Sequence, residues 1–293
     1  KKFITFSGAL IYDENKAKLP CNESQPIDPY KSNYITSKYL AELLANSFSD
    51  IIPIINLRLS NIYGPSNFNR PDLILMIFNK ILNNEKVIIN SKKPLRDFIH
   101  TDDVAEAVIS LCKSKFTGTI NVGTGITTSI EKICNIIEKL TKHKIFSRNV
   151  NVLGPMNYKH DISLIKNVCG WRPKIKIEKG LEETWKELNK SRKGKSSFHL
   201  EKKKIFVTGS SGFLGNNLLS TLKKRGYKVY ALNKKKLDLM SMNNIKKVFT
   251  IYKPDMVFHC AGRVGGIRFT DTNPAKIFHQ NMIINANVFE ACK

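Results

Sequence analysis

The strand, turn and helix between residues 205 and 225 constrain the fold more than any other segment of the chain. Residues 207–215 read V-T-G-S-S-G-F-L-G and place Gly209, Gly212 and Gly215 between an apolar strand and an amphipathic helix. Glycines at this spacing permit a tight turn, close approach of the backbone to a pyrophosphate, and close packing of helix on strand. The helix N-terminus also favours anions. A glycine triplet alone would suit an ordinary turn, but the flanking strand and helix favour dinucleotide binding.

The rest of the chain alternates between short apolar strands and helical patterns. This order is typical of an α/β fold with a doubly wound parallel sheet, the Rossmann architecture, here with a smaller substrate-binding part inside residues 66–188. The predicted strands cover residues 3–6, 54–59, 87–89, 205–208, 228–232 and 256–260, and the predicted helices 34–48, 73–82, 104–112, 130–140, 213–225, 242–252 and 277–293.

A polar, basic segment divides the sequence. Residues 189–204 read N-K-S-R-K-G-K-S-S-F-H-L-E-K-K-K, which predicts a linker. It separates a part with a candidate tyrosine–lysine element, residues 1–188, from the dinucleotide-binding part, residues 205–293.

Composition narrows the class of protein. The sequence contains no run of eighteen apolar residues, so no membrane span is expected. The six cysteines form no C-x-x-C pair, which argues against a zinc site or a disulfide framework and indicates a reducing, cytoplasmic location. The net charge of +24 would suit nucleic-acid binding, but lysine is spread along the whole chain, and anionic small molecules explain a basic site equally well. We therefore expect no nucleic-acid partner.

The residues after the strand at 228–232 bear on the cofactor. NAD binding favours an acidic residue there to hold the ribose 2′-hydroxyl, whereas this chain reads Asn233-Lys234-Lys235-Lys236. A basic cluster suits the 2′-phosphate of NADP. A solvated lysine run is the alternative, so NADP is favoured and NAD stays possible.

Longer motifs resemble one family. Residues 203–293 resemble the N-terminal part of the GDP-L-fucose synthases, chiefly through A-G-R-V-G-G-I-R-F-T-D-T-N-P-A at 261–275. Residues 1–188 resemble the C-terminal part of the same superfamily, through Y-I-T-S-K at 34–38, R-L-S-N-I-Y-G-P at 58–65 and R-D-F-I-H-T-D-D at 96–103. The chain thus resembles the extended short-chain dehydrogenases/reductases of the NAD-dependent epimerase/dehydratase family. The resemblance implies an enzyme acting on a nucleotide sugar by epimerisation, dehydration or 4-keto reduction, and a homodimer.

The resemblance also assigns site residues. Lys235 would meet the 2′-phosphate of NADP, Arg96 would clamp the substrate pyrophosphate, and Asn61 would hydrogen-bond the sugar or diphosphate. For Arg96 the alternative is an ion pair with Asp97 or Asp103, and His100 is expected to be structural. The full cofactor-binding set is Gly209, Ser211, Gly212, Phe213, Leu214, Gly215, Lys235, Asp238, Leu239, Ala261, Gly262, Arg263, Asn281 and Lys38.

Tyr34 and Lys38 are the candidate catalytic pair. Residues four apart lie on one face of a helix. A phenol with a pKa of about 10 is a poor base at neutral pH, and a nearby ammonium favours its phenolate form. The family places a serine or threonine at the position of Gly8, so Ser7 is the candidate for the third catalytic residue, whose hydroxyl would polarise the substrate oxygen. Thr36 or a water is the alternative for this role. Leu10 replaces the cysteine that GDP-L-fucose synthases use for epimerisation, and residues 67–75 contain no histidine.

The order of the two parts is the reverse of the family's order. One interpretation is a circular permutant that closes into a single domain, which we favour. The other is a window across two fused enzymes. A non-catalytic dinucleotide-binding scaffold or regulator is a further alternative, because Gly8 departs from the catalytic pattern.

Overall fold

The computed structural model describes residues 2–65, 72–150, 154–190, 204–232, 237–263 and 274–292. A six-stranded sheet in the order β10-β9-β11-β1-β2-β6 forms its centre, and all five strand pairings in it are parallel. The strands are β9 (Lys204–Thr208), β10 (Lys228–Leu232), β11 (Met256–His259), β1 (Phe3–Gly8), β2 (Ile54–Leu59) and β6 (Gly118–Val122). This is the predicted α/β fold with a parallel sheet.

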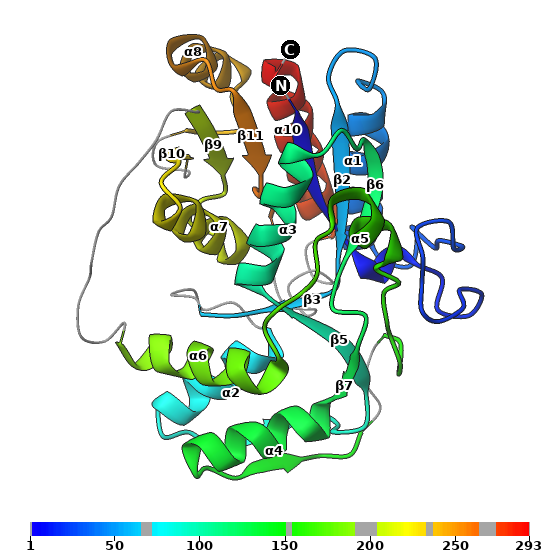
Figure 1. Ribbon diagram of the computed structural model, residues 1–293, viewed down its shortest axis with the longest axis vertical. Coiled ribbons are helices and arrows are strands. Elements are labelled where there is room, and N and C mark those ends of the chain that lie inside the picture. Colours follow the sequence, from blue (N-terminus) through cyan, green and yellow to red (C-terminus); the bar gives the residue numbers. More distant parts are fainter. Residues whose placement is uncertain are drawn as a thin grey trace.

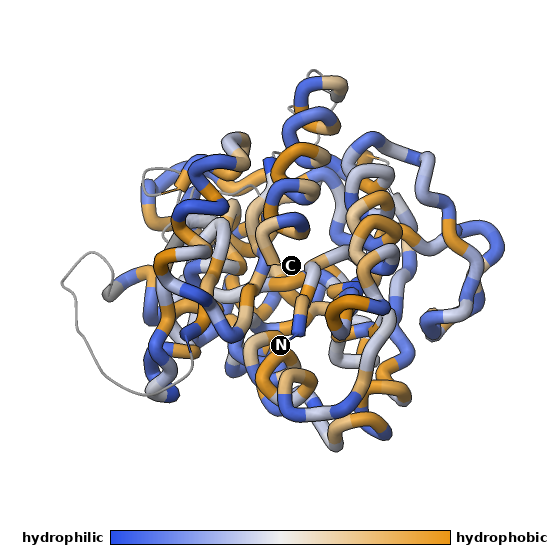
Figure 2. The backbone as a smooth tube through the Cα atoms, turned by 90° about the horizontal axis from the view of Figure 1, so that it is seen from above, coloured by the Kyte–Doolittle hydropathy of each residue, from blue (hydrophilic) through white to orange (hydrophobic). Residues whose placement is uncertain are grey.

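Helices cover both faces of this sheet (Figure 1). One face carries α3 (Thr101–Lys113), α5 (Ser163–Cys169) and α7 (Phe213–Lys224). The other carries α1 (Asn33–Asn46), α8 (Met242–Tyr252) and α10 (Pro274–Cys292). Along the tube of Figure 2, hydrophilic and hydrophobic residues alternate within the helices, as expected for amphipathic helices that lie on a sheet.

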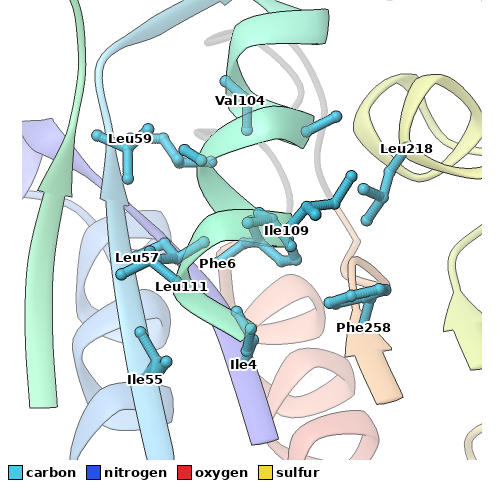
Figure 3. Close-up of a cluster of buried hydrophobic side chains, with 14 of the residues drawn as sticks. Ile4, Phe6, Ile55, Leu57, Leu59, Val104, Ile109, Leu111, Leu218 and Phe258 are labelled. Carbon is cyan, nitrogen blue, oxygen red and sulfur yellow. The ribbon is translucent and has the colours of Figure 1, made fainter. Parts of the chain in front are cut away.

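The alternation of side chains along the strands sorts the core into two layers. Ile4 and Phe6 point to the face of α3 and α7, where Figure 3 shows Phe6 beside Ile109 and Ile4 beside Leu111, and Leu218 of α7 belongs to the same cluster. Phe3 points to the opposite face and packs against Phe289 of α10, with the two rings tilted and their centroids 4.3 Å apart. Because successive strand residues face opposite sides, odd-numbered residues of β1 lie on the side of α1 and α10. The same alternation determines on which side of the sheet the side chain of Ser7 lies.

Strands from both sides of the predicted linker share the sheet. Phe3, Ile4 and Thr5 of β1 pair with residues 257–259 of β11. Asn189 belongs to α6 (Ile177–Lys190) and Lys204 to β9, and residues 191–203 lie outside the described residues.

A second, smaller core lies beyond the carboxyl end of the sheet (Figure 1). It contains α2 (Leu73–Leu82), α4 (Ile130–Thr141) and α6, a three-stranded sheet of β3 (Asn61–Tyr63), β5 (Leu95–His100) and β7 (Thr127–Ser129), and a two-stranded sheet of β4 (Val87–Ile89) and β8 (Ile145–Ser147). A short 3-10 helix, η1 (Ala9–Ile11), follows β1. None of the described helices is long and apolar enough to span a bilayer.

Candidate active site

The chain reverses direction across the sheet at β9. The path from β9 through α7 leads to β10 on one side, and the path through α8 then leads to β11 on the other. Ligands of doubly wound sheets bind at the carboxyl ends of the strands at such a switch point. Gly209 follows β9 and Ala261 follows β11, so both predicted cofactor-binding segments lie there.

The glycine turn has no room for side chains. Gly209 has a φ of +63°, and a Cβ on it would lie 2.7 Å from the backbone N and Cα of Ala261. A Cβ on Gly215 would collide with the carbonyl oxygen of Gly209, and one on Gly212 would lie 3.1 Å from the same oxygen. Gly212 is the N-cap of α7 and has no side chain to satisfy the first amides of the helix. The turn therefore presents backbone, as anion binding at a helix N-terminus requires.

The side chains next to these glycines are used for packing. Phe213 is buried in the second core, Leu214 packs against the first, and Ser211 is exposed. Asp238 is exposed and accepts a hydrogen bond from the amide of Met240, whereas Leu239 packs under α10. Lys235 lies outside the described residues.

Asn281 of α10 fixes residues 261–263, the second predicted cofactor-binding segment. Its buried amide accepts a hydrogen bond from the Arg263 backbone N–H at 2.6 Å and donates one to the Arg263 carbonyl at 3.1 Å. A Cβ on Gly262 would lie 3.6 Å from Asn281 Oδ1 and 4.0 Å from Lys38 Nζ. The glycine turn, residues 261–263 and Lys38 are therefore adjacent in space.

Tyr34 and Lys38 lie in the first two turns of α1. Ser32 caps this helix by accepting a hydrogen bond from the Ile35 amide. Lys38 Nζ donates to the carbonyl oxygen of Phe6 in β1 at 3.0 Å and lies 6.0 Å from the centroid of the Tyr34 ring. Both side chains are half-buried. The contact with Phe6 holds the pair against the carboxyl end of β1.

Ser7 lies on the α1 side of β1, because it follows the alternation of Phe3 and Thr5. The residue is 6% exposed, and its Oγ has no hydrogen-bond partner among the described residues. A buried hydroxyl without a protein partner is costly, and a catalytic role or a bound water would account for it. At Gly8, by contrast, a Cβ would meet nothing within 4 Å.

A buried ion pair holds α1 to β2, and the sequence did not predict it. Arg58 donates to Glu42 through Nη2 at 2.8 Å and through Nε at 3.1 Å, and its guanidinium carbon lies 5.1 Å from the centroid of the Tyr12 ring. Although burial opposes the charge, the hydrogen bonds and charge of Glu42 raise the pKa of Arg58. Glu42 is one helical turn beyond Lys38, so the pair fixes the helix that carries the candidate catalytic residues.

Arg96 forms neither of the ion pairs that we considered as an alternative. Asp97 accepts hydrogen bonds from the backbone amides of residues 124, 125 and 160, and Asp103 accepts them from residues 174 and 175. Arg96 itself is half-buried, donates to the Leu95 carbonyl, and has no carboxylate within 4.0 Å among the described residues. Burial lowers the pKa of Arg96, and Glu14 partly offsets this.

Two other residues of the motifs can be placed. Asn61 is half-buried in β3, paired in register with Phe98. His100 caps α3 by accepting a hydrogen bond from the Asp102 amide at 3.3 Å, and burial lowers its pKa. This is the structural role expected of His100.

A cavity of about 490 Å³ adjoins the end of β1, starting at Ala9. Three exposed apolar side chains, Leu10, Leu19 and Met156, lie along it, together with the carboxylates of Asp13 and Glu14. Its other lining residues are Tyr12, Asn15, Ala17, Cys21, Lys31, Gly154, Pro155, Asn157 and Tyr158.

The model of the NAD dependent epimerase/dehydratase family matches residues 1–123 and 205–293, which together contain the glycine turn and the tyrosine–lysine pair. The chain belongs to this family.

Relatives within the family differ in the reaction they are named for. The UDP-glucuronate 4-epimerase of Thermodesulfobacterium geofontis is 32% identical over 199 residues, covering 64% of this chain and 60% of that protein. The GDP-L-colitose synthase of Yersinia pseudotuberculosis is 36% identical over 90 residues, covering 31% of this chain and 29% of that protein.

Solved structures of family members have the same fold. A UDP-N-acetylglucosamine 4-epimerase from Methanobrevibacter ruminantium matches with a TM-score of 0.60 and 28% identity, covering 65% of this chain and 64% of that one. A UDP-glucose 4-epimerase from Thermotoga maritima matches with a TM-score of 0.61 and 25% identity, covering 66% and 65%. The chain thus spans less than two thirds of the length of each relative that it matches here.

Proposed function

We propose that this chain binds a nicotinamide dinucleotide and catalyses oxidation or reduction at a sugar carbon of a nucleotide-activated sugar. The observation that carries the proposal is the position of Lys38. Its ammonium lies beside Gly262 of the cofactor segment and donates to Phe6 at the end of β1, next to the buried hydroxyl of Ser7. Groups suited to holding a dinucleotide and to moving a proton therefore lie together at the carboxyl end of the sheet.

The cofactor fits the residues present. The backbone turn at Gly209, Gly212 and Gly215 would hold the pyrophosphate, since no Cβ could be accommodated at Gly209 or Gly215. Residues 261–263 would line the remainder, and Lys38 would hold the nicotinamide ribose. When bound, the nicotinamide ring would supply hydride acceptance or donation. We favour NADP because of Lys235, with NAD as the alternative.

The chain's own residues would manage the proton and the substrate. Tyr34 would remove a proton from the sugar hydroxyl or return it to the keto oxygen, with the Lys38 charge favouring the phenolate. Ser7 would donate a hydrogen bond to the same oxygen. Arg96, which has no carboxylate partner among the described residues, would bind the diphosphate through its planar guanidinium, and Asn61 would contact the sugar or diphosphate.

The test compares wild type with Tyr34→Phe on UDP-, GDP- and dTDP-sugars, in the presence of NAD or NADP. Exchange of the sugar C4 or C5 hydrogen in labelled water, or turnover of the reduced cofactor, measures the reaction. We expect Tyr34→Phe to lose at least a hundredfold in rate while it still binds cofactor. Equal rates in both proteins would favour the non-catalytic scaffold instead.

Cofactor preference is measured separately, by fluorescence titration with NADPH and NADH. We expect tighter binding of NADPH, and Lys235→Ala should weaken NADPH binding while leaving NADH binding unchanged. Equal affinity for both cofactors in wild type would remove the case for NADP. Oligomeric state, which the resemblance predicts to be a homodimer, is measured by light scattering on the same samples.

A further inference from the structure

A buried histidine connects the two cofactor segments. Thr208 and His259 are the last residues of β9 and β11 and are register partners in the parallel pairing of these strands. Both side chains are buried, with exposed fractions of 0% and 5%. Thr208 Oγ1 lies 2.7 Å from His259 Nδ1, and His259 Nε2 lies 2.9 Å from Asn285 Oδ1 on α10. The Ala261 backbone N–H donates to Thr208 Oγ1 at 3.4 Å.

These contacts define which ring nitrogen carries the proton. An amide oxygen has no hydrogen, so His259 Nε2 must be the donor to Asn285. A neutral imidazole has one N–H, and Nδ1 therefore accepts the hydroxyl hydrogen of Thr208. The hydroxyl oxygen of Thr208 is then free to accept from Ala261. The hydrogen bonds run in one direction, from Ala261 through Thr208 to His259, while His259 donates onward to Asn285.

The surroundings favour this neutral form. Burial lowers the pKa of His259 to about 4, against the opposing hydrogen bond to Asn285, and the positive charge of Lys38 lowers it further. A cationic ring would therefore be opposed both by its burial and by the catalytic ammonium nearby.

The chain of hydrogen bonds lies where the two cofactor segments are closest. Gly209, directly after Thr208, approaches Ala261 so closely that a Cβ would lie 2.7 Å from its backbone. Asn285 and Asn281 lie one turn apart on α10, and Asn281 holds Arg263 through two backbone hydrogen bonds. One helix face thus anchors both ends of residues 259–263.

We propose that His259, as the neutral Nε2–H tautomer, is a positioning residue that holds Ala261 and the following segment at the distance from the glycine turn that the dinucleotide needs. The proposal rests on the proposed function only in naming the ligand. His259 would not touch the reacting atoms and would act through Thr208 and Ala261.

Four variants separate this role from general stability. His259→Phe keeps a buried aromatic ring, although a larger one, but removes both hydrogen bonds, and Thr208→Val replaces only the hydroxyl by a methyl group. His259→Asn keeps an acceptor near the position of Nδ1. His100→Phe is the matched control, because it makes the same change at a buried histidine of β5, outside the central sheet.

We expect His259→Phe and Thr208→Val each to weaken NADPH or NADH binding by about tenfold, a loss larger than that in kcat at saturating cofactor. The double variant should bind no more weakly than the worse single variant, since both act on one chain of contacts. His259→Asn should recover most of the affinity, and His100→Phe should bind cofactor like wild type. Unchanged affinity in folded His259→Phe, or additive losses in the double variant, would overturn the proposal.

Two measurements on cofactor-free protein keep the result separate from the proposed function. Nitrogen-15 NMR of His259 should show a protonated Nε2 and an unprotonated Nδ1, and the Ala261 amide should exchange with solvent faster in Thr208→Val than in wild type. A proton on Nδ1, or unchanged exchange, would contradict the positioning role. If the wild type binds no dinucleotide but both results hold, then the proposed function fails and the positioning of Ala261 stands.

Discussion

Glu42 and Arg58 form a bidentate ion pair in the core between α1 and β2, with side chains that are 3% and 7% exposed. A buried pair contributes little over a well-packed apolar pair, but removing one partner leaves a buried charge uncompensated. We expect Glu42→Ala to lower the free energy of unfolding by about 3–5 kcal/mol, measured by urea denaturation.

Two variants test whether the cause is the unpaired charge. Glu42→Leu combined with Arg58→Met should be closer to wild type than Glu42→Ala, because no charge stays buried. Lys186→Ala, which removes an exposed ion pair with Glu182 on α6, should cost under about 1 kcal/mol. A double variant as unstable as Glu42→Ala would show that lost packing, and not the unpaired charge, causes the decrease in the free energy of unfolding.

Gly209 and Gly215 should tolerate no side chain if the turn holds a dinucleotide. Gly209→Ala would force a Cβ against Ala261 at a positive φ, and Gly215→Ala would force α7 away from β9. We expect each to weaken dinucleotide binding at least tenfold in fluorescence titrations. Gly8→Ala is the control, because its Cβ has free space and its φ is −142°. Wild-type affinity in a folded Gly209→Ala protein would rule out this use of the turn.

Acid should destabilise the protein through its buried histidines. Burial lowers the pKa of His160 to about 3 and that of His259 to about 4, from an ordinary value of 6.5. Below pH 6.5 the unfolded chain binds protons that the folded chain does not, so stability falls as the pH drops from 6.5 to about 4 for His259 and to about 3 for His160, and it is unaffected above pH 6.5. At pH 5 each histidine should cost about 2 kcal/mol.

Buried acids complicate the pH profile, so a difference measurement is needed. Burial raises the pKa values of Glu23 and Asp97. Protonation of these two acids therefore adds stability as the pH falls, which opposes the loss caused by the histidines. We therefore compare urea unfolding at pH 7.5 and pH 5.0 for wild type and His160→Phe. The stability lost between the two pH values should be about 2 kcal/mol smaller in the variant. An equal loss in both would mean that His160 titrates normally.

The sequence predicted most elements of the central sheet, because their apolar periodicity is local. The strands at 54–59 and 228–232 and the helix at 242–252 have the predicted bounds. The sequence analysis missed β6 of this sheet and β5 of the smaller three-stranded sheet, since Gly118–Val122 and Leu95–His100 mix apolar with charged or polar residues. Their burial depends on neighbouring strands distant in sequence, such as the pairing of β6 with β2.

The same difference between local and distant signals decides which residues of the candidate site could be predicted from the sequence. The glycine turn and the Tyr34–Lys38 spacing are local motifs and could be read directly. The hydrogen-bond partners of His259 are 51 and 26 positions away in the sequence. The only local feature that could have indicated its role is that a polar residue ends an apolar strand. The alternative that Arg96 pairs with Asp97 or Asp103 was wrong, because backbone amides from distant loops compete successfully for both carboxylates.

Ser7 and Gly8 offer a test of where the catalytic hydroxyl is placed. Ser7 Oγ is buried without a partner among the described residues, on the same side of the sheet as Lys38, whereas Gly8 leaves open space where the family has a hydroxyl. If Ser7 supplies the hydrogen bond to the substrate oxygen, Ser7→Ala should lower kcat by about a hundredfold, the usual loss for one such donor. Removing an unpartnered buried hydroxyl should leave stability unchanged or slightly raised.

The double variant Ser7→Ala, Gly8→Ser then moves the hydroxyl by one residue to the family's position, where the added side chain has room. Because neighbouring strand residues face opposite sides, this hydroxyl is useful only if the backbone at the end of β1 turns it toward Tyr34. We expect the double variant to recover at least tenfold of the kcat lost in Ser7→Ala, measured by cofactor turnover with unfolding followed in parallel. Full activity in Ser7→Ala would instead assign the oxygen-polarising role to Thr36 or to a bound water.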